Sequence, residues 1–167
     1  MSGGRAPTHA PFDPARHRLT PSRWFEDFRP GETYPSPSRT VTTADFAAFR
    51  ALSGDNHPIH YDRPFCQGLG MSGLFAHGLQ VLCFTAAGAG LFPHEATDSL
   101  VAFLDQSCRF LHPVVEDDTL YPLLEIVECV AGRSTGVIVM RATIHNQHGA
   151  LVLEGTQRYL LRRRPAA

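Results

Sequence analysis

The sequence lacks an excess of charge of either sign, and this absence excludes several classes of partner. Its 167 residues include 15 Lys or Arg and 16 Asp or Glu, for a formal net charge of −1. A balanced chain has no broad attraction for nucleic acid or for an acidic membrane surface, so neither is expected as a partner. The length suits one domain with a substantial core and is too short for two.

The sequence also lacks paired cysteines and an apolar leader. Its four cysteines form no C-x-x-C motif, so we expect reduced thiols in a cytoplasmic protein. Residues 1–22 contain Pro, Gly, Arg and His but not the apolar stretch of a signal peptide. They are expected to form a flexible N-terminal leader.

No apolar run is long enough to predict a membrane span. The longest, residues 74–92, is interrupted by His77, Gln80 and several glycines, whereas a spanning helix needs about 20 strongly apolar residues. From His77 to Leu91 no residue is formally charged, and nearly every position is apolar or small. This pattern is typical of a helix that other structure covers on all sides.

A shorter helix is predicted before this stretch. Phe46 and Phe49 lie at helical spacing, and Thr43 is the expected N-cap. Asp45 falls in the first turn, where the helix dipole favours an acidic side chain. Gly54 lies where a glycine commonly ends a helix.

The second half of the chain predicts antiparallel strands. Four segments of about ten residues have the composition of strands: 99–112, 119–130, 135–146 and 150–162. In the third, alternate residues from Ile138 to Ile144 are apolar and share one face. A buried helix followed by such strands predicts an α+β domain in which a curved antiparallel sheet wraps around one central helix.

The segment SGDNHPIHYD, residues 53–62, carries the most informative side chains. Asp55 and His60 are five positions apart, and Pro58 prevents the segment from being helical throughout. Across a bent loop, a carboxylate and an imidazole can hold one water between them, with one group taking a proton and the other giving one. This suits addition or removal of water better than nucleophilic attack, because no serine or cysteine stands between the two residues.

These residues resemble the MaoC-like dehydratases, a family that includes the (R)-specific enoyl-CoA hydratases and has the hot-dog fold. The resemblance rests on four segments: LSGD (52–55), PIH (58–60), AHGL (76–79) and FLHPVVEDDTL (110–120). It implies one MaoC-like hot-dog domain over residues 23–163, after the leader at 1–22. Two positions depart from the family pattern: His57 stands where asparagine usually precedes the proline, and Asp117 stands where glycine is usual.

The resemblance implies that Asp55 and His60 are catalytic and that they add or remove water at the C2–C3 bond of an acyl-CoA thioester. Asp55 would activate the water as a base, and His60 would supply the proton to C2. The backbone N–H of Gly78 would bind the thioester oxygen as negative charge develops on it. His57 and His77 are the other candidate substrate-binding residues.

No cofactor is expected, because CoA is part of the substrate. Two histidines of the motif, His57 and His60, could also be read as metal ligands together with His77, Asp55 and Asp62. The first two flank a proline and need not share a face as they would on a helix, so no metal is expected. The resemblance further implies a homodimer or a higher homo-oligomer and a place in fatty acid metabolism.

Two other functions stay open. The first is a hot-dog acyl-CoA thioesterase, which would need a catalytic carboxylate on or near the central helix. The first acidic residue after His77 is Glu95, beyond that helix, and this disfavours a thioesterase. The second is a non-catalytic acyl-CoA-binding protein, which the unusual His57 keeps open.

Overall fold

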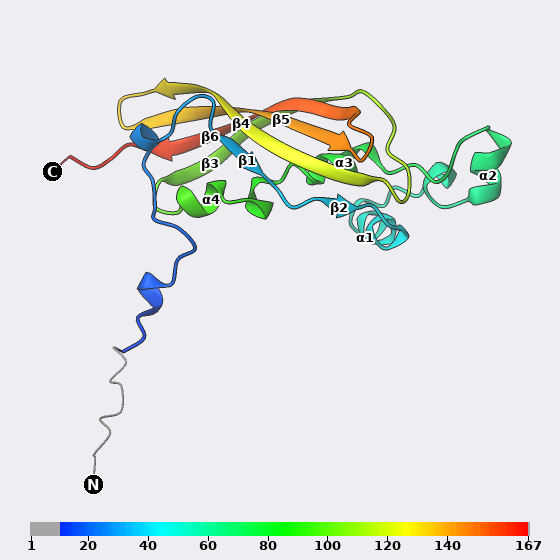
Figure 1. Ribbon diagram of the computed structural model, residues 1–167, viewed down its shortest axis with the longest axis horizontal. Helices are drawn as coiled ribbons and strands as arrows, with labels where there is room; N and C mark the ends of the chain where they lie inside the picture. The colour runs from blue at the N-terminus through cyan, green and yellow to red at the C-terminus, as the bar shows by residue number, and fades with distance from the viewer. Residues whose placement is uncertain (1–10, 167) are drawn as a thin grey trace, which may run out of the picture.

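The computed structural model describes residues 11–166 as a curved antiparallel sheet with short helices beside it (Figure 1). Its four long strands are β3 (Leu100–Phe110), β4 (Thr119–Ala131), β5 (Thr135–Asn146) and β6 (Leu151–Arg162). The strand order is β1-β4-β5-β6-β3, with β1 (Thr33–Pro35) and β2 (Arg39–Thr40) both paired to β4. The long strands match the four predicted segments, because β-branched and aromatic composition between turn residues is a strong local signal.

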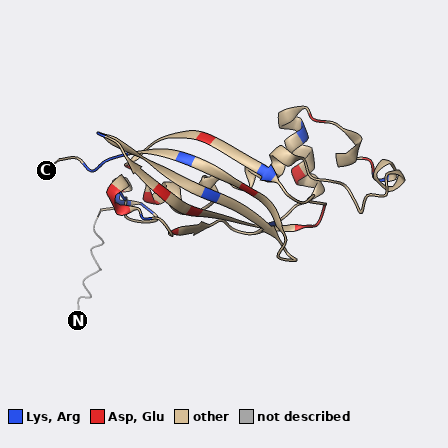
Figure 2. Cartoon of the chain, turned by 90° about the horizontal axis from the view of Figure 1, so that it is seen from above, with Lys and Arg blue, Asp and Glu red and all other residues tan. Residues whose placement is uncertain are grey.

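Charged residues on the sheet form pairs directly across neighbouring strands. Arg141 lies opposite Glu125, and Arg109 lies opposite Glu154; both pairs are ion-paired. Figure 2 shows acidic and basic residues interspersed along the strands. Opposite charges in register favour this strand pairing over a shifted one.

The buried residues form two clusters, and the second one lies next to the segment 53–62. It joins Val81 and Phe84 from the central helical region to apolar side chains of the sheet, namely Leu120, Ile144, Val152 and Leu153. The sheet therefore packs against helix α3 (Gly78–Cys83). No helix within residues 11–166 is long and apolar enough to cross a membrane.

The central helix differs from the prediction in its length and its covering. It ends at Cys83 instead of continuing to Leu91, and a 3-10 turn and the short helix α4 (Phe92–Glu95) follow it. Gly88 and Gly90 lie in that interruption, where helix propensity is low. Leu79 is 63% exposed, so one side of α3 is not covered within a single chain.

The N-cap of helix α1 (Thr43–Ser53) lies one residue earlier in the chain than predicted. The N-cap is Thr42, whose backbone N–H donates to Asp45 Oδ2 over 2.9 Å. The capping box requires a three-residue spacing, which Thr42 and Asp45 have and Thr43 does not. The predicted end is confirmed, because Gly54 closes the helix with a left-handed φ of 75°.

Arg23 joins the N-terminal segment to the end of α4. Its guanidinium donates to Glu32 over 2.7 Å and to Glu95 over 2.8 Å, and it lies over the ring of Phe28. Within the predicted leader, Arg18 forms an ion pair with Asp98 over 2.6 Å. Residues 1–10 lie outside the described residues, and the flexibility of the leader stays a prediction.

Replacement of Gly155 should strongly destabilise the sheet. A Cβ at this position in β6 would overlap the carbonyl oxygen of Ser107 and lie 2.9 Å from Cys108 Cα. Both obstacles belong to the backbone of the paired strand β3, so they cannot turn aside as a side chain can. For Gly155→Ala we expect a loss of about 2–3 kcal/mol in the free energy of unfolding, measured with urea.

Gly73→Ala is the matched control. No atom lies within 4 Å of a Cβ built at Gly73, so the free energy of unfolding should change by less than about 0.5 kcal/mol. Equal stability of the two variants would contradict the close approach of β3 and β6 at Gly155.

Candidate active site

The loop between α1 and α3 carries the two predicted catalytic residues. After α1 ends at Gly54, the hydroxyl of Ser53 accepts a hydrogen bond from Asp55 N over 3.1 Å. A 3-10 turn over Pro58–His60 follows, with proline at its first position, where the missing N–H costs nothing. The chain therefore bends between Asp55 and His60, as the proline predicted.

The structure brings Asp55 and His60 together across this bend. Asp55 Oδ2 lies 4.0 Å from His60 Nε2, and the two side chains are 48% and 8% exposed. The separation is too long for a direct hydrogen bond. A water molecule placed between the two atoms reaches both, as a bridging water does between polar groups more than 3.5 Å apart.

The protonation of His60 follows from its other nitrogen. His60 Nδ1 lies 2.6 Å from the carbonyl oxygen of Phe75. A carbonyl only accepts hydrogen bonds, so Nδ1 carries the proton and the Nε2 of the neutral ring keeps its lone pair on the side of Asp55. Burial lowers the pKa of His60 below its ordinary 6.5, and the nearby imidazoles of His77 and His57 lower it further, against the opposing effects of the Phe75 carbonyl and Asp55.

His77 lies behind His60 and does not face an open space. It is 1% exposed, and its ring stacks on that of His60 at 3.7 Å between centroids with an interplanar angle of 24°. Its Nδ1 lies 3.0 Å from Gln80 Oε1, and its Nε2 lies 2.8 Å from the hydroxyl of Tyr61. Both ring nitrogens are therefore engaged within the protein, which leaves none for a substrate.

His57, the residue that departs from the family pattern, caps the 3-10 turn. Its Nδ1 accepts a hydrogen bond from Ile59 N over 3.4 Å, and its side chain is exposed. Its ring centroid lies 6.5 Å from that of His60. An asparagine could accept the same bond, so the histidine preserves the local turn.

Gly78, the first residue of α3, borders a cavity of about 280 Å³. The cavity is also lined by Ala76, Val81 and residues 110–114, whereas Asp55 and His60 are not among its lining residues. A Cβ at Gly78 would lie 3.3 Å from Phe110 Cζ, which is tight for a carbon contact. The absence of a side chain keeps the backbone of Gly78 open to a small group in this cavity.

Asp55, His60 and His77 also form a cluster in which one ligand atom from each lies within 4.8 Å of the others. A metal ion binds an imidazole nitrogen along its lone pair, which lies in the plane of the ring. The rings of His60 and His77 are stacked and nearly parallel, so one ion cannot lie in both planes. Asp62, which the sequence also suggested as a metal ligand, instead caps helix α2 (Arg63–Gly68) by accepting a hydrogen bond from Phe65 N.

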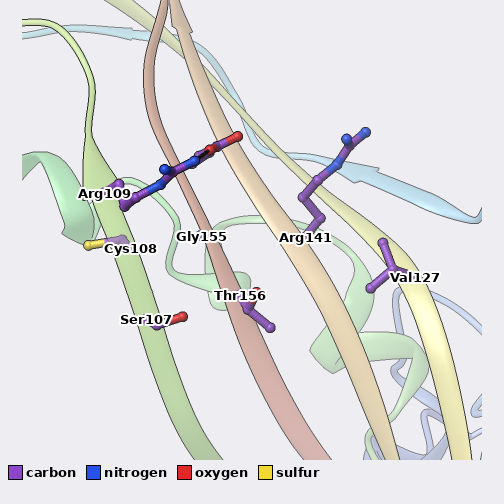
Figure 3. Close-up of a pocket in the computed structure, with 8 residues that line it drawn as sticks. Ser107, Cys108, Arg109, Val127, Arg141, Gly155 and Thr156 are labelled. Carbon is purple, nitrogen blue, oxygen red and sulfur yellow. Dashed lines mark hydrogen bonds and ion pairs between the residues drawn. The ribbon is translucent and has the colours of Figure 1, made fainter.

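The arginines of the sheet do not reveal a phosphate site. Arg109 and Arg141 line a hollow of about 420 Å³ on the strands (Figure 3). Glu154 and Glu125 pair with them, and Arg63 is paired with Glu116. None of the residues that line this hollow belongs to the loop with Asp55 and His60.

Sequence reasoning missed the support of the histidines. The Tyr61 hydroxyl bonds His77 and lies 3.2 Å from the carbonyl oxygen of Asp55. Gln80 had a usable signal, because it stands three residues after His77 at the spacing of a capping box. The hydrogen bond of His60 to the Phe75 carbonyl could not be predicted from the sequence, because every residue has a backbone carbonyl.

Comparison with known proteins supports the resemblance. A family model described as the MaoC like domain matches residues 27–147. Protein MaoC of Klebsiella aerogenes is 32% identical over 62% of this chain and 30% of its own length. The beta-methylmalyl-CoA dehydratase of Chloroflexus aurantiacus is 27% identical over 88% of this chain and 42% of its own length. The chain thus spans less than half the length of these two relatives.

A third relative is closer to this chain in length. The (R)-specific enoyl-CoA hydratase of Aeromonas caviae is 27% identical over 71% of this chain and 84% of its own length. Among solved structures, a monoamine oxidase regulatory protein from Archaeoglobus fulgidus has a TM-score of 0.81 at 29% identity, covering 89% of this chain and 99% of its own.

A protein of Mycobacterium tuberculosis described as a double hot-dog fold has a TM-score of 0.71 at 26% identity. It covers 87% of this chain, while this chain matches 46% of it. The predicted hot-dog fold is therefore confirmed. Because the matched region spans most of the chain and includes Asp55, His60 and Gly78, the chain belongs to the MaoC-like dehydratase domain family.

Proposed function

We propose that the chain is a hydratase or dehydratase that adds or removes water at the C2–C3 double bond of an acyl-CoA thioester. The observation that carries this proposal is the 4.0 Å separation of Asp55 Oδ2 and His60 Nε2, which suits one bridging water. The enoyl-CoA hydratase and methylmalyl-CoA dehydratase names of two relatives support the substrate class. Four free cysteines suit a reducing cytoplasmic setting.

The hydrogen bonding of His60 favours a different division of roles from the one expected from the sequence. With its proton held at Nδ1 by Phe75, the neutral ring can accept a proton at Nε2 but cannot donate one there. In our proposal, His60 Nε2 takes a proton from the water while the hydroxyl adds to C3, and the imidazolium returns that proton to C2. Asp55 orients the water and offsets the transient positive charge of His60.

The thioester carbonyl is proposed to occupy the cavity beside Gly78. Negative charge grows on its oxygen when the hydroxyl adds to C3, and a fixed N–H donor stabilises that charge. Phe110 lies over Gly78, and its ring would form an apolar wall beside the carbonyl.

The carboxylate that the sequence offered for the thioesterase alternative is engaged elsewhere in the protein. Glu95, the first acidic residue after His77, is bonded to Arg23 and to the hydroxyl of Tyr34. It therefore belongs to the cluster that anchors the N-terminal segment. A non-catalytic acyl-CoA-binding protein would have the same fold, and the measurements below distinguish it from a hydratase.

His60→Gln should reduce kcat for hydration of a short or medium enoyl-CoA by about 100-fold or more, because a positioned acid–base group contributes 10²- to 10⁴-fold. Asp55→Asn should reduce kcat by about 100-fold, because it removes the negative charge that orients the water and offsets the imidazolium. Hydration is followed by the loss of absorbance of the conjugated thioester, and a thiol reagent in the same cuvette detects hydrolysis.

Asp62→Asn is the control from the same loop. Asn caps helices as well as Asp, so the cap of α2 should persist and kcat should stay within about twofold of the unmodified protein. Thiol release by the unmodified protein would favour a thioesterase, and the absence of both reactions would favour a binder.

The pH dependence tests which form of His60 acts. If the neutral ring accepts the proton, kcat/KM is full above the pKa of His60 and is lost as the pH falls through it. Burial and the neighbouring imidazoles lower this pKa, so the midpoint of the acid limb should lie below 6.5. A loss of kcat/KM as the pH rises through that midpoint would instead mean that the imidazolium is the active form.

We further propose that the protein is a homodimer formed through β3 and α3. Strand β3 is paired only with β6 and leaves its other edge free among the described residues. Large apolar side chains are exposed beside this edge: Leu79 (63%), Phe103 (52%) and Leu104 (46%). An unpaired edge with an adjoining apolar surface favours association with a second copy.

Light scattering after size-exclusion chromatography should give a mass of about 37 kDa, twice the 18.4 kDa of one chain. Leu104→Lys places a charge on the free edge and should shift the mass toward the monomer. Val130→Lys in β4 is the control, since Val130 is equally exposed (46%) but lies away from β3. A dimer that tolerates both substitutions would place the interface elsewhere.

A further inference from the structure

The ring of His77 is fixed at both nitrogens and on one face. Gln80 Oε1 accepts hydrogen bonds from His77 N over 3.3 Å and from His77 Nδ1 over 3.0 Å. The Tyr61 hydroxyl bonds His77 Nε2, and the ring of Phe49 packs at 4.9 Å between centroids. These contacts leave His77 a single orientation.

Gln80 is held in this arrangement although it leaves one of its own groups unsatisfied. Its side chain is 4% exposed, and its Nε2 is buried with no hydrogen-bond partner among the described residues. Turning the amide over would place its NH₂ group against the backbone N–H of His77, so the orientation is set by His77. A buried unpaired donor lowers stability. The unpaired Nε2 of Gln80 thus accompanies the two hydrogen bonds by which its Oε1 holds His77.

Tyr61 connects the same ring to the reactive loop. It follows His60 in the chain, its hydroxyl donates to His77 Nε2, and the same oxygen lies 3.2 Å from the backbone oxygen of Asp55. The guanidinium of Arg50 lies over its ring at 4.8 Å. Tyr61 therefore links the loop that carries His60 to the start of α3.

The free face of His77 is the surface on which His60 rests. With stacked centroids 3.7 Å apart, the imidazole of His60 cannot tilt toward His77, and its edge is held by the Phe75 carbonyl. The titratable groups that face His60 are Asp55, His57 and Tyr61 from its own loop and His77 from the start of α3.

We propose that His77 is a positioning residue: held by Gln80 and Tyr61, it supports the ring of His60 so that Nε2 stays directed at Asp55. The inference deepens the proposed function and rests on it for its kinetic part only. A supporting ring of this kind does not touch the substrate. It removes orientations of His60 that would misplace the reacting nitrogen, and misplacement by about 1 Å can cost on the order of 100-fold in rate.

His77→Phe tests the inference, because phenylalanine keeps an aromatic ring but loses both nitrogen contacts. We expect kcat for enoyl-CoA hydration to fall at least about tenfold, with KM within about twofold. NMR titration of the His60 ring, which needs no turnover, should show its midpoint moving upward toward 6.5, because the imidazole of His77 contributes to lowering it.

Tyr61→Phe provides a second, milder variant in case His77→Phe does not fold. It removes only the hydroxyl that holds His77 Nε2, so kcat should fall about three- to tenfold with KM unchanged. Tyr121→Phe is its control, since Tyr121 is an exposed residue of β4 (47%) outside the site, and its kcat should not change.

The outcomes separate the two proposals. Absence of hydration by the unmodified protein rejects the hydratase function, whereas a shifted His60 titration in Tyr61→Phe, which keeps the imidazole of His77, supports the positioning role. A lower melting temperature with an unchanged His60 midpoint and unchanged kcat in the variants that fold would show that His77 is only structural and would overturn the inference.

Discussion

The hydrogen bond between His60 Nδ1 and the carbonyl of Phe75 is the interaction on which the site depends. It joins the loop that follows α1 to the segment that leads into α3. It also decides which nitrogen of His60 carries the proton, and therefore which atom faces Asp55. Without this bond the two residues would share a loop but not a defined chemistry. The reactive pair is thus set by backbone geometry as much as by side-chain identity.

The sheet supplies the rigid support for this loop. Its inner face packs on Val81 and Phe84, which fixes the start of α3 and with it His77 and Gly78. Its charged side chains are largely cancelled in cross-strand pairs, so they contribute register more than an electrostatic field. Under the proposed function, the described sheet pairs would therefore offer no free cluster of arginines to the phosphates of CoA, and the cavity near Gly78 would bind the thioester end of the substrate.

Local signals predicted what depends on local forces. Strand-like composition, with alternation in the third segment, predicted the four long strands. Gly54 predicted the end of α1, and Pro58 predicted the bend that lets Asp55 approach His60. The interruption of α3 after Cys83 was missed, because an apolar composition does not distinguish a long helix from a short one followed by turns. The stack of His77 on His60 was also missed, since it forms between residues 17 positions apart and depends on how two loops pack.

The anchoring of Arg23 has a consequence for how short a stable piece of this chain can be. Glu32 and Glu95 come together around one guanidinium, and each contacts the Tyr34 hydroxyl as well. A fragment that starts beyond Arg23 would leave two carboxylates side by side without their shared cation, in a partly buried place where water cannot fully screen them. The N-terminal boundary of any truncated protein is therefore dictated by electrostatics, even though the sheet itself begins ten residues later.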